Sequence, residues 1–116
     1  MAVVFACISP HPPIIVREVG HGRERQTSAT IAALEQVAQA MAGHAPQTTV
    51  VIATHGPIRH DAFGVLTAPL AEGDFALWGA PQVRLSFPND LEAVALIRQE
   101  ARQAGVPLAP IQRWDG

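Results

Sequence analysis

The sequence predicts a single α/β domain with a largely parallel central sheet, flanking helices and a site at the C-terminal ends of the strands. Three observations lead to this fold class. Residues 2–8 and 48–54 are uncharged runs of apolar and β-branched residues, typical of strands buried on both faces of a parallel sheet. A segment of helical periodicity lies between them, and a loop rich in proline or glycine follows each run. Strand, helix and strand in this order form a right-handed βαβ unit with parallel strands.

The helix between the two runs is expected to begin near Ser28, and either Thr27 or Ser28 can cap its start. Gly43 and Pro46 end it. Residues 17–26, before the helix, are polar, contain two glycines and are expected to form a loop. Within the helix, apolar residues recur at spacings of three and four and form one stripe: Ile31, Leu34, Val37, Ala38 and Met41.

The region from residue 58 to residue 73 is irregular and is expected to be a loop, or a loop that contains a short strand near Phe63–Leu66. Two short strands are predicted after it. They are residues 75–78 and 83–87, which lie on either side of Gly-Ala-Pro and could form a hairpin.

A second helix is predicted after Asn89, whose side chain is expected to cap it with Glu92 as the capping-box partner. Gly105 and Pro107 stop this helix, and Leu108–Ile111 is expected to be the last strand. The inner face of the helix is expected to consist of four apolar residues: Leu91, Val94, Ala95 and Ala101.

Composition excludes several classes of function. A chain of 116 residues can bury one core but not two, and its net charge of −2 provides no basic surface for nucleic acid or anionic lipid. The single cysteine, Cys7, excludes an internal disulfide and favours the cytoplasm; we expect it to be a buried core residue. The apolar N-terminus is too short for a membrane span.

Two histidines follow the two predicted strands directly. His11 comes three residues after residue 8, and His55 comes one residue after residue 54. Parallel strands place their C-terminal ends at one edge of the sheet, where ligands of open α/β folds bind, so the two imidazoles are expected to converge. Proline or glycine flanks each histidine, which constrains the backbone of a site. Alternatively, each histidine caps a backbone group or lies in a polar cleft.

Neutral imidazole is the commonest protein ligand of transition metals. Two histidines and one carboxylate with open positions are typical of non-haem iron(II) oxygenases, although two histidines also suit zinc. Glu18 could supply a carboxylate or pair with a nearby arginine, and His60 with Asp61 could contact a substrate or orient a ligand, or lie in a solvated loop. We expect surface positions for His21 and His44, and packing roles for the tryptophans, Trp78 and Trp114.

The segments ISPHPPIIVREVG and VVIATHGP resemble the N-terminal half of the class III extradiol dioxygenases. More narrowly, they are similar to the catalytic B-subunit-like proteins of protocatechuate-type ring-cleavage enzymes, including the group named after the AmmeMemoRadiSam system. The resemblance implies an α/β fold, a mononuclear non-haem iron(II), and opening of a catechol ring by O₂. It matches the first two histidine ligands of the family to His11 in SPHPP and His55 in THGP.

The same resemblance places the third ligand, a glutamate, and the acid/base histidine in a C-terminal half that this chain does not contain. We therefore expect an N-terminal portion of a longer dioxygenase-like protein, with no catalytic acid or base of its own. An isolated chain of this kind would be inactive, whereas the complete protein would act on a small aromatic diol and O₂.

Two other functions fit the same residues. A zinc-dependent hydrolase could use the same two histidines, because a fold does not fix the chemistry of its site. A non-enzymatic binding or assembly module is the third hypothesis, in which an apolar sheet edge left uncovered drives formation of a homo-oligomer.

Overall fold

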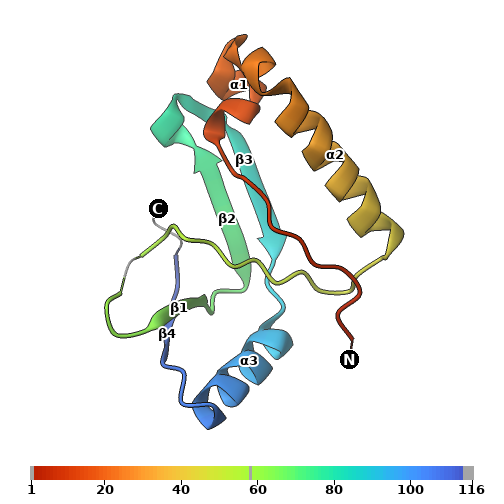
Figure 1. Ribbon diagram of the computed structural model, residues 1–116. Coiled ribbons are helices and arrows are strands. Elements are labelled where there is room, and N and C mark those ends of the chain that lie inside the picture. The colour runs from red at the N-terminus through yellow and green to blue at the C-terminus, as the bar shows by residue number, and fades with distance from the viewer. Residues whose placement is uncertain (1, 58, 114–116) are drawn as a thin grey trace. The chain divides into compact units, whose positions relative to one another are not determined.

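The computed structural model describes residues 2–57 and 59–113 and confirms the α/β fold class (Figure 1). Two compact units can be distinguished: unit 1 is Met1–Thr49 with Asp74–Val83, and unit 2 is Val50–Gly73 with Arg84–Gly116. Each unit is considered by itself, and the expected single domain stays a prediction. No helix in the described part of the chain is both long and apolar enough to cross a membrane.

Along the described chain, two helices are followed by three strands, a further helix and a last strand. They are α1 (Arg17–Gly20), α2 (Ser28–Gly43), β1 (Phe63–Leu66), β2 (Leu70–Phe75), β3 (Ala80–Pro88), α3 (Leu91–Gln103) and β4 (Leu108–Ile111). Short 3-10 turns are formed by Pro13–Ile15, Arg23–Thr27 and Ala76–Trp78.

The two predicted central strands are not formed. Residues 2–8 and 48–54 have no regular secondary structure, and Ile8 and Ile52 are 102% and 94% exposed. Across the described ranges, no backbone–backbone hydrogen bond reaches residues 2–8 or 49–54. An apolar run becomes a strand only when a neighbouring strand pairs with its backbone, and no described strand pairs with residues 2–8 or 49–54. The expected βαβ unit is therefore wrong, and so is the buried position of Cys7, which is exposed.

Unit 1 is built on α2, as the sequence predicts. Its apolar stripe is half-buried at four of the five expected positions, Ile31, Leu34, Val37 and Met41, whereas Ala38 is exposed. The hydroxyl of Thr27 donates to the backbone oxygen of Glu24 (2.8 Å) and does not cap the helix. Val19 and Ala80 are the buried apolar residues of this unit. Residues 17–26 are not an irregular loop, since they contain α1 and most of a 3-10 turn.

Unit 2 contains a parallel strand pair between the two strands predicted at residues 63–66 and 108–111. β1 and β4 pair in the register Phe63 with Leu108 and Leu66 with Ile111. The pairing continues on both sides of β1, because the Phe63 N–H donates to Pro107 (3.0 Å) and the Thr67 N–H donates to Ile111 (2.9 Å). The parallel sheet of this chain is thus formed by segments 45 residues apart, not by the two N-terminal runs.

The predicted hairpin exists, but its strands differ from the expected ones. β2 begins earlier, at Leu70, and the turn is the 3-10 segment Ala76–Trp78, which ends at Gly79 with φ of 79°. Residues 76–78 were expected in a strand; they close the turn because the positive φ of Gly79 reverses the chain there. Trp78 packs against Phe75, with ring centroids 5.8 Å apart. Trp114 lies outside the described residues.

The second helix is capped by Asp90 and not by Asn89. The Asp90 carboxylate accepts the backbone N–H of Ala93 (2.9 Å), while the Asn89 amide donates to the backbone oxygens of Leu66 (3.0 Å) and Ala68 (2.8 Å). Asn89 therefore fastens the end of β1. The expected capping box with Glu92 is not formed, because the residue three positions after the cap is Ala93. The helix ends at Gln103, and the φ of 71° at Gly105 permits the closing bond from the Val106 N–H to Ala101.

The face of α3 turned towards the rest of unit 2 differs partly from the expected one. Val94 and Ala101 are half-buried, as predicted, and Ala93 joins them. Leu91 and Ala95 were expected on this inner face but are exposed. At 100° per residue, positions 93, 94 and 101 lie on one side of the helix, and positions 91 and 95 lie outside that half-buried side.

Candidate functional site

His11 lies in unit 1 on an extended, exposed segment that no strand precedes. Pro12, which follows it, has φ of −70° and ψ of 131°, and the chain then turns at once into the 3-10 segment Pro13–Ile15. We call residues 11–27 the His11 loop. The backbone on the C-terminal side of this histidine is thus fixed by proline and by a hydrogen-bonded turn.

The His11 loop is held by a chain of short hydrogen bonds. The Val16 N–H donates to Pro13 (3.0 Å), and the Gly20 N–H donates to Val16 (2.8 Å). Gly20 is buried and closely packed, because a Cβ at this position would lie 2.8 Å from the backbone oxygen of Ile14. The loop is therefore a compact structure of consecutive turns.

Glu24 fastens the second half of the His11 loop. Its carboxylate accepts the backbone N–H of Gly22 (2.6 Å), which is oriented by the positive φ of 97° at Gly22. The pKa of the Glu24 carboxyl is lowered, mainly by the hydrogen bond from its own backbone N–H and also by the bond from Gly22 and the charges of Arg25 and Arg17. Burial acts in the opposite direction and raises this pKa. The carboxylate form is the one that holds the turn.

A shallow polar hollow of about 600 Å³ opens on the same loop. Its lining combines charges of both signs and one imidazole: Arg17, Glu18, His21, Gly22, Glu24, Arg25 and Gln82. Glu18, proposed from the sequence as a carboxylate ligand or an arginine partner, is exposed and shares this hollow with Arg17 and Arg25. His21 and His44 are exposed, as predicted, and the His44 ring lies 5.8 Å from that of Phe5.

His55 lies in unit 2 and is also exposed, directly before Gly56, whose φ is 114°. We call residues 55–62, without residue 58, the His55 loop. Asp61 pairs with Arg59 (Nε to Oδ1, 3.3 Å), and their side chains are 75% and 47% exposed. His60 is exposed as well. Asp61 is therefore engaged by an arginine beside it in sequence.

Iron(II) or zinc would require several donors in one place. The imidazoles of His11 and His55 have the donor chemistry for two positions of such a centre. Among residues 2–57 and 59–113, no group of three or more His, Cys, Asp or Glu side chains is arranged to hold a metal ion. The convergence of His11 and His55 stays a prediction, as do the roles of Glu18, His60 and Asp61.

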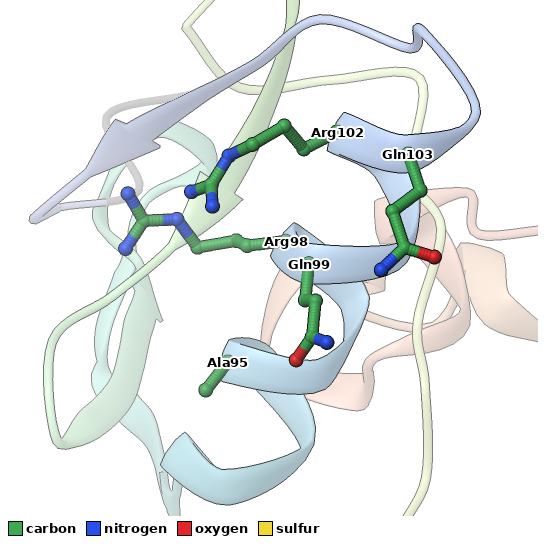
Figure 2. Close-up of a pocket in the computed structure, with 5 residues that line it drawn as sticks. All are labelled: Ala95, Arg98, Gln99, Arg102 and Gln103. Atoms are coloured by element: carbon green, nitrogen blue, oxygen red, sulfur yellow. The ribbon is translucent and has the colours of Figure 1, made fainter.

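A second hollow, of about 530 Å³, lies on α3 in unit 2 and is lined by one face of that helix (Figure 2). Its lining is Ala95, Arg98, Gln99, Arg102 and Gln103. The sequence reasoning missed this hollow and the role of Glu24. The spacing of Arg98 and Arg102, four residues apart in a predicted helix, was a readable signal for the first. Nothing local in the sequence indicates which backbone N–H a glutamate side chain accepts.

Comparison with known proteins gives a family and a relative. The model of the family described as the catalytic LigB subunit of aromatic ring-opening dioxygenase matches residues 5–114. Protein CA_C1420 of Clostridium acetobutylicum is 32% identical over 98 residues, which are 84% of this chain and 21% of that protein, so the chain spans about a fifth of its relative. No solved structure matches significantly. The family match covers both histidine motifs, and the chain belongs to the family of the catalytic LigB subunit of aromatic ring-opening dioxygenases.

Proposed function

We propose that this chain carries two histidine ligands, His11 and His55, of a non-haem iron(II) centre in an extradiol dioxygenase that opens catechol rings. The observation that carries the proposal is the position of these residues. They are exposed histidines next to proline or glycine, and both lie inside the segment that matches the family of ring-opening dioxygenases. A cytoplasmic protein of this kind would use a small aromatic diol and O₂.

Bound iron(II) would supply open coordination positions for both catechol oxygens and for O₂. The chain's own part is to present two neutral imidazoles on backbones of restricted freedom, since a metal centre needs ligands held before the metal arrives. The turns of the His11 loop serve this purpose for His11. Glu18, His60 and Asp61 are proposed as residues that contact the substrate or orient a ligand.

The complete active site is proposed to need more polypeptide than this chain. The third ligand, a glutamate, and the acid/base histidine would come from that additional part, in line with the fifth of its relative's length that this chain spans. We propose that the complete protein is the enzyme, and that this chain alone does not open catechol rings.

An anaerobic calorimetric titration with iron(II) tests the ligand assignment. The 116-residue chain is compared with His11→Ala, His55→Ala and the control His44→Ala, which removes an exposed histidine at the end of α2. We expect each ligand variant to bind iron(II) about tenfold or more weakly than the parent chain, the loss typical for a removed metal-site group, while the control is unchanged. Unchanged affinity in either ligand variant would refute the assignment of that histidine.

The zinc alternative is separated by metal analysis of protein purified without oxygen. Stoichiometric iron in the parent chain that is absent from both ligand variants supports the dioxygenase proposal. Zinc bound in the same way, in protein prepared with both metals available, would favour a hydrolase-like centre on the same residues.

A second candidate function is a non-catalytic assembly module that forms a homo-oligomer. The observation that favours it is the exposure of the apolar runs at residues 2–8 and 48–54, with Ile8 and Ile52 almost fully exposed. Exposed apolar strands whose backbone is not paired are templates for pairing with another chain. Sedimentation velocity tests this function: a concentration-dependent oligomer supports it, and a monomer over the whole concentration range contradicts it.

A further inference from the structure

One exposed face of α3 combines an apolar end with a positively charged end. Leu91, Ala95, Arg98 and Arg102 follow one another at spacings of four, three and four residues, so they form one line along the helix. All four are exposed. At 1.5 Å per residue the line is about 17 Å long. We call these four residues, with Gln99 beside them, the α3 face.

Within residues 2–57 and 59–113, the two arginines at one end of the α3 face form no ion pair with an acidic side chain. Figure 2 shows their side chains extending to the same side of the helix, away from Gln99 and Gln103. Among the described residues, neither arginine side chain takes part in the Arg59–Asp61 ion pair or in a side-chain hydrogen bond, whereas the backbone oxygen of Arg102 accepts from the Gly105 N–H (3.3 Å). Like charges four residues apart destabilise a helix, so an acidic partner would relieve the repulsion between them.

The acidic residues of α3 lie elsewhere on the helix. At 100° per residue, Glu100 is roughly opposite to Arg98 and Arg102, and Glu92 is displaced from them by roughly a quarter turn or more. The α3 face is therefore positive on a chain whose net charge is −2. The positive charge is confined to this face, so a complementary ligand would carry negative charges over a similar length.

We propose that the α3 face docks an acidic helical segment of a partner polypeptide. Two carboxylates four residues apart on such a segment repeat the spacing of Arg98 and Arg102, and an apolar side chain one or two turns away would cover Leu91. Arginine is enriched at protein interfaces because its guanidinium holds carboxylates in a fixed, two-pronged geometry.

Other occupants fit the α3 face less well. A small anion would remain largely in water, because the hollow is shallow and lined by a single helix, and exposed charges are screened there. Nucleic acid would need a broader basic surface than two arginines. A second copy that used the same face would bring the arginines of the two copies together. This inference goes beyond the proposed iron centre and does not depend on it.

The test uses nitrogen-15 NMR of the 116-residue chain and an alanine-based helical peptide with two glutamates four residues apart and a leucine near each end. A matched peptide carries glutamine in place of glutamate. We expect the glutamate peptide to shift the Nε resonances of Arg98 and Arg102 and the amide of Leu91 at low salt. The glutamine peptide should not shift them, and physiological salt should weaken the binding.

Two double variants complete the test. Arg98→Gln with Arg102→Gln should weaken binding of the glutamate peptide by about tenfold, because both charge contacts are lost. Arg23→Gln with Arg59→Gln removes the same two charges from other elements and should leave binding unchanged. The spectra of both variants must keep the dispersion of the parent chain.

Three results would overturn the proposal. The first is equal binding of the glutamate and glutamine peptides, and the second is equal weakening by the two double variants, which would mean attraction by net charge alone. The third is an equal effect of acetate at the same carboxylate concentration, which would make the α3 face a site for free anions and not for a polypeptide.

Discussion

The loops that carry the two histidines differ in how they are supported. The His11 loop contains two successive hydrogen-bonded turns, a buried Gly20 and the Glu24 carboxylate bound to the Gly22 N–H. In the His55 loop, the described residues 59–61 form an ion pair between the exposed side chains of Arg59 and Asp61 and make no backbone–backbone hydrogen bond.

This difference shows that similar motifs do not give equal preorganisation. Proline and glycine beside a histidine restrict its own backbone, but the residues that follow decide whether the loop is held in one arrangement. His11 would offer a metal a ligand on a fixed support. The segment after His55 is held less, because the described residues 59–61 make no backbone–backbone hydrogen bond, and ordering this segment would reduce the binding free energy of a metal.

The largest expected effect comes from filling the space at Gly20. In Gly20→Ala, the new Cβ would lie 2.5 Å from the Glu24 carboxylate and 2.8 Å from the backbone oxygen of Ile14, so the turn must move. We expect a loss of about 1–3 kcal/mol in the free energy of unfolding, the usual effect of overpacking. Urea denaturation measures it.

Gly43→Ala is the matched control for this substitution. A Cβ at Gly43, the last residue of α2, would meet nothing within 4 Å, so no loss of stability is expected. If the two variants are equally stable, the His11 loop is not the close-packed structure described above, and its difference from the His55 loop disappears.

Hydrogen exchange compares the two loops directly. The amides of Gly20 and His21 donate to Val16 and Arg17, whereas those of His60 and Asp61 make no backbone hydrogen bond in the described structure. We expect the first pair to exchange about tenfold or more slowly than the second, relative to the rates of unstructured peptides. In Gly20→Ala this protection should fall. Equal protection of both pairs in the parent chain would contradict the comparison.

The pH dependence of stability tests the role of Glu24. Because the folded chain lowers the pKa of this carboxyl, its stabilising contribution is present above the unfolded value of about 4.3 and is lost as the pH falls through the lower folded value. We expect Glu24→Gln to be less stable than the parent chain at pH 7 and to lose less stability between pH 5 and pH 3. Urea midpoints across this range measure it.

Glu35→Gln, in α2, serves as the control for the loss of one negative charge. We expect the pH dependence of stability to change in Glu24→Gln but not in Glu35→Gln. If both variants show the same change in how stability depends on pH, the cause is a general effect of net charge. The Glu24 carboxylate would then not stabilise the His11 loop specifically.

The elements that the sequence predicted well are those with local signals. The stripe of α2 and the stop signal at Gly105 are contained within a few turns of helix, and they recur in the structure. The runs at residues 2–8 and 48–54 have equally clear local patterns, yet they form no strand. A strand depends on a partner that the local pattern does not identify, and this is why the prediction failed there.

For the candidate site, the structure shows that His11 and His55 are exposed and lie outside helices and strands, whereas their role as ligands stays a prediction. The link between Glu24 and Gly22 was not predictable, because it depends on a left-handed backbone conformation that the sequence only permits. The geometry that would bring the two histidines together depends on long-range packing and stays a prediction.

The smallest effect is expected from Asp61→Asn in the His55 loop. The Arg59–Asp61 pair is 3.3 Å long, but both side chains are largely in water, so the Coulomb gain is screened and offset by the ordering of two mobile side chains. We expect the free energy of unfolding to change by about 0.5 kcal/mol or less in urea denaturation, with little further change at high salt. A loss as large as that of Gly20→Ala would show that this ion pair anchors a well-ordered loop. His55 would then be as firmly supported as His11, and the two motifs would be equivalent in structure as well as in sequence.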